Sequence, residues 1–151
     1  MAEKYSIRLA NIEDMKNVFD LSNDNIVRQN SIHREKIEWE NHVEWFKNKL
    51  NDKNCLFYII EDENKNFIGQ TRIDKTDDEN IVSISISKDF RGNGLSTKII
   101  KECSDKTKFN EIVAYIKKDN IASQKAFQKA GYVFADENDD GLLKFEYLRK
   151  N

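Results

Sequence analysis

The sequence feature that most constrains the fold is a strand, a glycine turn and a helix in direct succession over residues 81–100. Within residues 81–87, apolar and polar side chains alternate from Val82 onward, which predicts a half-buried β-strand. Gly92 and Gly94 mark a turn, and apolar residues then recur at helical spacing over residues 95–100. Since the first N–H groups of a helix lack intrahelical partners and its dipole is positive there, this order of elements favours anion binding.

We interpret the turn as a cradle for a pyrophosphate, because glycines let a backbone approach a ligand closely. A strand-to-helix turn that merely requires positive φ at Gly92 or Gly94 would explain the glycines equally well. The chain contains neither Gly-x-x-x-x-Gly-Lys-Ser/Thr nor Gly-x-Gly-x-x-Gly, the common phosphate-binding strings. The glycine turn alone therefore leaves both interpretations open.

The composition of the chain restricts the classes of function that the protein can have. The chain has 151 residues without a repeat or a break in composition, so we expect a single domain over residues 1–151. A net charge of −2 argues against nucleic acid as a partner. No apolar run is long enough to span a membrane and the first residues lack a signal-peptide pattern, so we expect a cytoplasmic protein. Cys55 and Cys103 are expected to be free thiols, and with two histidines no metal site is predicted.

Periodicity predicts the order β-α-α-β-β-β-α-β-α-β-β. The first helix starts at Asn11, with Asp14 completing an approximate capping box. Residues 26–34 are predicted to be irregular, and a second helix is predicted over residues 35–50. One face of that helix is expected to pack into the core, and an adjacent face carries His42 and Trp45. The predicted core face comprises Trp39, Val43, Phe46 and Leu50.

Two strings resemble motifs of the GCN5-related N-acetyltransferase (GNAT) family. Residues 91–96 are similar to the family's Arg/Gln-x-x-Gly-x-Gly/Ala loop, with Ser96 where the family prefers Gly or Ala. Residues 120–132 resemble its Asn-x-x-Ala/Ser-x-x-hydrophobic-Tyr/Phe-x-Lys-x-Gly-Phe/Tyr segment. The two strings occur in the family's order and separation, and the resemblance extends over residues 5–147.

The resemblance implies a mixed α/β GNAT fold with a central mixed sheet of about seven strands and about four helices, and acetyl-CoA as co-substrate. It further implies that the strands over residues 81–87 and 111–116 run parallel and separate at their C-terminal ends. The pantetheine arm would enter this gap as an added strand does. The cofactor-binding residues so implied are Ile84, Ser85, Ile86, Arg91, Gly92, Asn93, Gly94, Leu95, Ser96, Thr97, Asn120, Ser123 and Phe127.

The implied reaction is direct attack of an amine on the thioester carbonyl. A free alkyl amine has a pKa around 10, so a base or a water chain must take its proton. The backbone N–H of Ile86 is expected to stabilise the oxyanion. Ser83 and Ser85 are candidates for positioning a water, although an outward-facing polar row on a strand explains them as well.

Phe127 departs from the family pattern, because it occupies the position of a tyrosine general acid and has no hydroxyl. Proton transfer would then use water or another tyrosine, with Tyr115 and Tyr132 as the first candidates. Otherwise the chain would be a non-catalytic acyl-CoA-binding domain.

The N-terminal half resembles N-acetyltransferases that act on nucleotide-linked amino sugars, those of the pseudaminic acid pathway in particular. The resemblance rests on Val-Arg-x-x-Ser at residues 27–31, Ile37, and His-x-x-Trp-Phe at residues 42–46. It implies that Arg28 pairs with a substrate phosphate and that Trp45 stacks on a sugar or base. His42 is a substrate candidate too, but a packed helix flank explains His42 and Trp45 equally well.

We therefore predict an N-acetyltransferase for a small-molecule primary amine, preferably a nucleotide-linked amino sugar. A protein N-terminal or lysine acetyltransferase and a non-catalytic acyl-CoA-binding domain are the alternatives. The sequence leaves open a homodimer, the identity of the amine and the length of the acyl chain.

Overall fold

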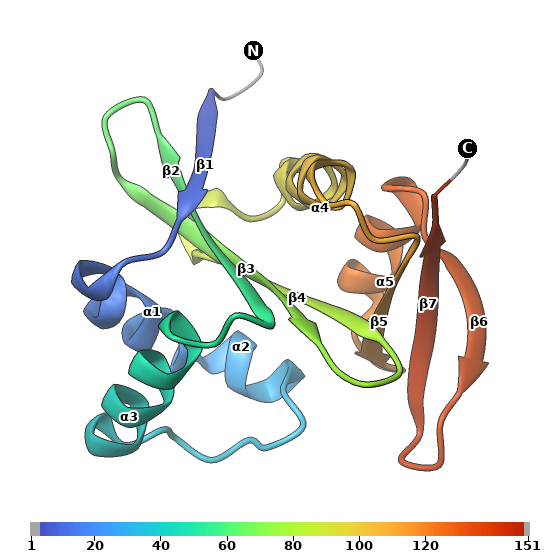
Figure 1. The fold of residues 1–151 in the computed structure, drawn as a ribbon, viewed down its shortest axis with the longest axis horizontal. Helices are drawn as coiled ribbons and strands as arrows, with labels where there is room; N and C mark the ends of the chain where they lie inside the picture. The colour runs from blue at the N-terminus through green and yellow to red at the C-terminus, as the bar shows by residue number, and fades with distance from the viewer. Residues whose placement is uncertain (1–3, 150–151) are drawn as a thin grey trace.

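The computed structural model describes residues 4–149, which fold into one sheet with helices on both faces (Figure 1). Two single turns of 3₁₀-helix, at Ile12–Asp14 and Lys88–Phe90, precede α1 and the glycine turn. The strands and α-helices are, in chain order, β1 (Tyr5–Leu9), α1 (Met15–Ser22), α2 (Asn25–Asn30), α3 (Trp39–Leu50), β2 (Cys55–Asp62), β3 (Phe67–Lys75), β4 (Asn80–Ile86), α4 (Leu95–Lys106), β5 (Glu111–Lys117), α5 (Ile121–Lys129), β6 (Val133–Glu137) and β7 (Leu142–Leu148).

The sheet has seven strands in the order β1-β2-β3-β4-β5-β7-β6, which confirms the predicted mixed sheet. Its neighbouring strands are antiparallel except for β4 and β5, which run parallel. In Figure 1 the group β1–β4 and the group β5–β7 diverge from their meeting point at β4 and β5. The two groups thus share one sheet but open away from each other.

The divergence is visible in the strand pairing. β4 pairs with β5 only through Ile81 and Val113, at the N-terminal end of β4. On its other side β4 pairs with β3 without any shift of register, from Gly69 opposite Ile86 to Lys75 opposite Asn80. The predicted separation of the two parallel strands is therefore confirmed.

The two faces of the sheet have different cores. On one face, Val82 and Ile86 of β4 belong to clusters that include Ile99 and Ile100 of α4. On the other face, α1 and α3 pack against β2 through a cluster of buried side chains, namely Val18, Phe46, Phe57 and Ile59. Figure 1 shows the same division, with α4 and α5 apart from α1, α2 and α3. The polar positions of β4 consequently face the α1–α3 layer.

A short helix, α2, occupies the start of the segment that was predicted to be irregular. Its N-cap is Asp24, whose carboxylate accepts the backbone N–H groups of Ile26 (3.0 Å) and Val27 (3.2 Å). Such a cap satisfies two N–H groups that have no intrahelical partner. Asp24 also follows directly on the last turn of α1, where its backbone N–H donates to the Leu21 carbonyl oxygen (3.1 Å).

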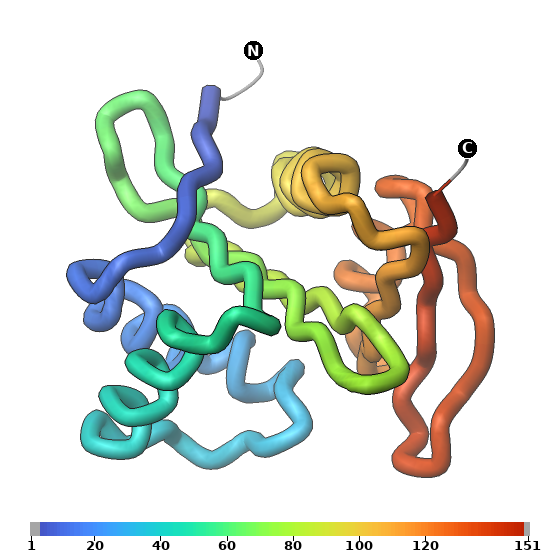
Figure 2. Tube along the Cα trace, in the orientation of Figure 1, coloured from blue at the N-terminus to red at the C-terminus, as the bar shows by residue number. Residues whose placement is uncertain are grey.

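The helix α3 starts at Trp39 rather than near residue 35. The Asn23 side chain donates to the carbonyl oxygen of Ile37 (2.9 Å) and accepts the Ile37 N–H (2.7 Å), which holds this segment outside the helix. Figure 2 shows the chain between α2 and α3 running as an open loop. The predicted core position of Trp39 is wrong, because its side chain is 41% exposed while His42 is buried. The capping box at Asn11 and Asp14 is confirmed.

Candidate active site

A cavity of about 840 Å³ lies where β4 and β5 separate, and it extends into both helical layers. Its walls include Ile84 of β4 and Ala114 of β5, together with Phe127 of α5 on one side and Trp45 of α3 on the other. We call the part next to α4 and α5 the donor side and the part next to α1–α3 the acceptor side.

The backbone of β4 presents polar groups to this gap. The N–H of Ser87 donates to the Ile68 carbonyl oxygen (2.7 Å), which makes Gly69 and Ile86 a non-hydrogen-bonded antiparallel pair. Such pairs alternate along a ladder, so Ile84 has the same orientation. The N–H and C=O groups of Ile84 and Ile86 therefore point away from β3, toward the separating β5. An extended pantetheine arm, which has amide groups of its own, fits such an edge.

Gly92 and Gly94 both have positive φ, at 84° and 79°. This conformation favours glycine, so the turn explanation of these residues is confirmed. A Cβ atom placed on either glycine would meet no atom within 4 Å. The backbone on this side of the turn is thus open to a ligand, and a pyrophosphate can approach it.

Other residues of the turn have partners within the protein. The Asn93 side chain accepts the N–H of Leu95 (3.2 Å), and the Leu95 side chain is buried in the core. Ser96 lines the cavity, as do Arg91 and Gly92. The cavity lining does not include Asn93, Gly94, Leu95 or Thr97. The N–H groups of the first turn of α4 beyond Leu95 are the ones left for an anion.

Arg91 connects three parts of the site. Its Nε donates to the Ile86 carbonyl oxygen (2.8 Å), and its Nη2 donates to the Asp24 carboxylate (2.9 Å). Burial works to raise the pKa of Asp24, but hydrogen bonds from Arg91 and from two backbone N–H groups outweigh it and hold that pKa below its ordinary value. Arg91 thus joins the end of β4 and the glycine turn to the start of α2.

The second string contributes Asn120, Ser123 and Phe127 to the cavity wall. Asn120 is the N-cap of α5, and its side chain accepts the Ser123 N–H (3.2 Å). The Phe127 ring is 2% exposed and meets Tyr132 edge-on at 5.0 Å between ring centroids. Phe127 therefore offers the cavity an apolar wall without a proton to donate.

The two tyrosines named as alternative acids lie in different places. The Tyr132 hydroxyl is buried against the Ser104 hydroxyl (2.7 Å) and is not part of the cavity wall. Tyr115 lines the cavity, and its hydroxyl donates to the Glu79 carboxylate (2.7 Å). Burial, the hydrogen bond to Glu79 and its negative charge raise the pKa of Tyr115. Tyr115 is accordingly the tyrosine that the structure brings to the site.

Arg28, His42 and Trp45 all line the acceptor side. The Arg28 guanidinium already makes hydrogen bonds within the protein, because it donates to the carbonyl oxygens of Ser22 (2.6 Å) and His33 (2.9 Å). It also donates to the Ser31 hydroxyl (3.2 Å). Most of its hydrogen-bonding capacity therefore holds α2 to the loop that follows.

His42 is 2% exposed, and its Nε2 lies 2.9 Å from the Met15 carbonyl oxygen. That nitrogen must be the donor, because a carbonyl oxygen only accepts. Burial lowers the pKa of His42 against the opposing effect of this hydrogen bond, so the ring is neutral near pH 7. The packed-flank interpretation of His42 thus has a structural basis, even though the ring edge reaches the cavity.

Gln70 and Arg72 of β3 also line the acceptor side, and the sequence analysis missed both. The Gln70 carboxamide is 5% exposed, and its Nε2 donates to the Ser85 hydroxyl (3.2 Å). The Arg72 guanidinium lies 5.0 Å from the Trp45 ring centroid. The available signal was the polar run at residues 70–72 inside an otherwise apolar strand.

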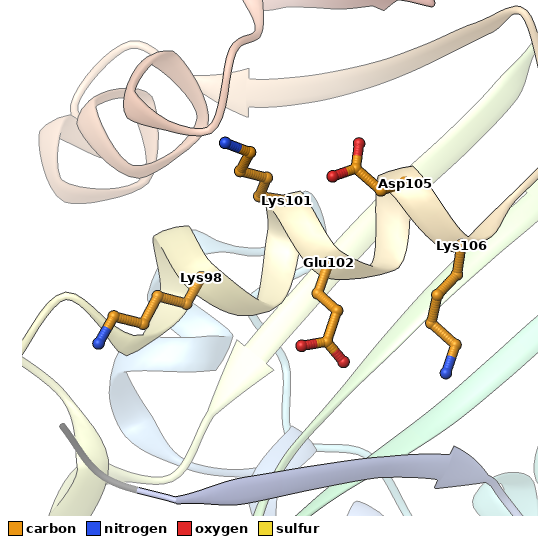
Figure 3. A pocket seen from close by; sticks show the side chains of 5 residues that line it. All are labelled: Lys98, Lys101, Glu102, Asp105 and Lys106. Carbon is orange, nitrogen blue, oxygen red and sulfur yellow. The ribbon is translucent and has the colours of Figure 1, made fainter.

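A second hollow, of about 410 Å³, lies on the surface of α4 (Figure 3). Figure 3 shows that its side chains come from one helix and carry charges of both signs. None of them lines the cavity between β4 and β5. The lining residues are Lys98, Lys101, Glu102, Asp105 and Lys106.

Residues 4–149 contain no group of three or more His, Cys, Asp or Glu side chains that could hold a metal ion. Among their helices, none has the length and apolar character needed to cross a membrane. Cys55 and Cys103 are free, as predicted.

Solved structures share this fold, although no curated protein sequence matches the chain. Spermidine N-acetyltransferase from Vibrio cholerae, solved with CoA and spermine, has a TM-score of 0.85 at 15% identity, covering 96% of this chain and 95% of that chain. A putative phosphinothricin N-acetyltransferase has a TM-score of 0.81 at 22% identity, covering 98% and 100%. An aminoglycoside acetyltransferase with coenzyme A and kanamycin has 0.79 at 16%, covering 97% and 95%.

The sequence itself matches one family model. The model of the acetyltransferase (GNAT) domain matches residues 5–133, which is most of the chain. The separation of β4 and β5 and the open glycine turn agree with the donor side that the family resemblance led us to expect. The chain therefore belongs to the GNAT acetyltransferase family, and acetyl-CoA is its co-substrate.

Proposed function

We propose that this enzyme acetylates the primary amine of a small, negatively charged molecule, and that the molecule is a nucleotide-linked amino sugar. The main observation in support is the positive charge of the side chains that line the cavity. Four cationic side chains line the cavity, and no Asp or Glu is among its lining residues. The four are Arg28, Arg72, Arg91 and Lys117.

Carboxylates compensate only part of this charge, from behind the wall. Arg72 pairs with Asp74 (3.2 Å) and Arg91 with Asp24 (2.9 Å). The hydrogen bonds of Arg28 go to uncharged oxygens, and Lys117 donates to the Gln29 carbonyl oxygen (3.0 Å). A nucleoside diphosphate therefore meets an attractive field here. A polyamine or an aminoglycoside meets like charge, which supports selection against both.

The acceptor side is also bounded. Lys117 of β5 reaches across to Gln29 of α2, so a side chain bridges the two walls. The loop after α2 adds residues such as Ile32 and Ile37 to the lining. A bounded chamber with an aromatic wall at Trp45 suits a sugar or base better than an extended protein tail. This supports a small-molecule acceptor over the protein acetyltransferase alternative.

The proposed reaction is direct transfer. The amine lone pair attacks the acetyl carbonyl carbon, a C–N bond forms, and the C–S bond breaks with its electron pair leaving on sulfur. The proton that nitrogen loses is available to that sulfur. The backbone N–H groups of Ile84 and Ile86 face the gap where the oxyanion would form. Ser83 and Ser85 remain candidates for positioning the water that carries the proton.

The test is the rate of thiol release from acetyl-CoA with four acceptors. They are a uridine-diphosphate-linked amino sugar, the same amino sugar without the nucleotide, spermidine and kanamycin. We expect kcat/KM to be at least tenfold higher for the nucleotide-linked sugar than for the free sugar, a difference of about 1.4 kcal/mol. A preference for spermidine or kanamycin would contradict the proposal, and equal rates for the two sugars would remove the role of the nucleotide.

A further inference from the structure

Four polar side chains form a compact group on the acceptor side of β3 and β4. Gln70 lies opposite Ser85, and Arg72 lies opposite Ser83. All four line the cavity. Because alternate residues of a strand face the same side of a sheet, the two cross-strand pairs stand next to each other on one face. We call this group the acceptor quartet.

Two atoms of the acceptor quartet are buried without a partner. Gln70 Oε1 and Ser83 Oγ make no hydrogen bond to any described residue. Gln70 is fixed in place, because its Nε2 donates to Ser85 Oγ (3.2 Å). Its carbonyl oxygen is therefore an oriented acceptor in the cavity wall. A buried polar atom left unpaired costs about 1–3 kcal/mol, so two such atoms in a cavity point to a ligand that pairs with them.

Arg72 provides the charge of the acceptor quartet. Its guanidinium lies 5.0 Å from the Trp45 ring centroid and 5.8 Å from that of Phe57. Its Nε donates to Asp74 (3.2 Å), while Nη1 and Nη2 make no hydrogen bond to any residue between 4 and 149. An arginine held on aromatic faces with two free NH₂ groups is suited to a carboxylate or a phosphate.

We propose that the acceptor quartet is a two-point subsite for the acceptor. Gln70 Oε1 accepts an N–H of the attacking amine, and Arg72 with Ser83 binds an anionic group of the same molecule. The two pairs are two residues apart along the strands, so the amine and the anion are separated by about 7 Å. The inference rests on the proposed function, because it takes the acceptor to be an anionic amine. It assigns the residues that bind the amine and the anionic group.

The acceptor quartet lies beside the reacting centre. Ile84 stands between Ser83 and Ser85, and its N–H faces the gap between β4 and β5. An amine held at Gln70 is thus next to the backbone that would hold the acetyl carbonyl. Holding a nucleophile in place at this point raises the rate without supplying a base.

The experiment compares two amines of matched length, 5-aminopentanoate and 1,5-diaminopentane, as acceptors and in calorimetric binding with CoA present. Wild type is expected to favour 5-aminopentanoate at least tenfold in kcat/KM. The Arg72→Gln variant should lose that preference with the Kd for acetyl-CoA unchanged. Lys75→Gln removes an exposed cation of the same strand and serves as the control that keeps the preference.

Gln70 is tested with the same two probes. Gln70→Met keeps the side-chain length but removes the acceptor oxygen, and we expect it to lower kcat/KM about tenfold for both amines at unchanged acetyl-CoA affinity. Gln70→Glu keeps an acceptor oxygen, so it should retain most of the rate with 1,5-diaminopentane. Equal losses in the two variants with that amine would show a structural role only and would overturn the assignment of Gln70.

The outcomes separate this subsite from the proposed substrate. If wild type does not distinguish the two amines, does not use or bind either, or keeps its preference in Arg72→Gln, the subsite is overturned. If the preference depends on Arg72 while nucleotide-linked sugars are inactive, the subsite stands and the substrate proposal fails.

Discussion

The donor side and the acceptor side of the cavity are built from different parts of the chain. On the donor side the groups that we expect to face the ligand are largely backbone, namely Ile84 and Ile86 of β4 and the turn at Gly92 and Gly94. On the acceptor side they are side chains contributed by α2, α3, β3, β4 and β5. A site built from backbone groups requires a particular chain conformation, which short sequence motifs can predict. A site built from side chains requires residues from separate segments to converge, which short motifs do not predict.

Gly69 belongs to neither side but holds β3 against β4, so its substitution should have the largest effect. A Cβ at Gly69 would collide with the Ser85 carbonyl oxygen and lie 3.1 Å from Ile86 Cα. We expect Gly69→Ala to reduce the free energy of unfolding by about 1–3 kcal/mol, because backbone cannot yield as a flexible side chain does. Acceptor KM should rise and acetyl-CoA affinity should fall. Denaturant unfolding measures the change in the free energy of unfolding.

Gly94→Val should affect ligand binding on the donor side alone, and because Gly94 has a positive φ (79°) the variant should also lose some stability. The side chain would fill the open space beside the turn, so we expect acetyl-CoA affinity to fall at least tenfold, about 1.4 kcal/mol. Calorimetry on the folded variant measures this. The acceptor KM at saturating acetyl-CoA should not change. Unchanged acetyl-CoA affinity would remove the phosphate role of the turn, and a raised acceptor KM would show that the two sides are not separable.

The two sides also differ in how far the sequence predicted them. The strand, turn and helix around Gly92 depend on local periodicity and glycine placement, and the structure has all three where they were expected. Helix α2 was missed because one residue, Asp24, both follows α1 and caps α2. Gln70 and Arg72 were missed because their meeting with Ser85 and Ser83 depends on strand register, which the sequence of one strand does not reveal.

Phe127→Tyr tests whether the donor side lacks a proton donor. The ring lines the cavity, so we expect a hydroxyl added to it to reach the cavity. If protonation of the leaving thiolate limits the rate, kcat should rise a few-fold, less than the 10²–10⁴ of a fully developed general acid. Acceptor KM should stay constant. A neutral result would assign the proton to water or to Tyr115, and Tyr115→Phe would lower kcat only if Tyr115 is the donor.

The smallest effect is expected at the ion pair between Asp24 and Arg91, which links the two sides. The folded-state pKa of Asp24 is depressed, so its contribution to stability is complete above the unfolded pKa of about 3.9 and is lost as pH falls through the folded value. Asp24→Asn should therefore destabilise the protein at pH 7 by up to about 1 kcal/mol, with the difference from wild type vanishing in acid. Thermal unfolding against pH measures this.

Asp20→Asn is the matched control for that measurement, since Asp20 makes an exposed ion pair with Lys16. At pH 7 it should cost less than Asp24→Asn, because the Lys16–Asp20 pair is more exposed than the Arg91–Asp24 pair. A destabilisation by Asp24→Asn that is the same at pH 7 and at pH 3 would assign the role of Asp24 to its hydrogen-bonding geometry rather than to its charge.

The cationic wall has a consequence for the protonation state of the nucleophile. An amine that enters as an ammonium ion meets Arg72 and Lys117 and finds no carboxylate among the described lining residues. Like charges disfavour the charged form, so we expect this wall to lower the pKa of the amine as it enters. An ammonium ion would then give its first proton to bulk solvent, and that step would need no basic side chain.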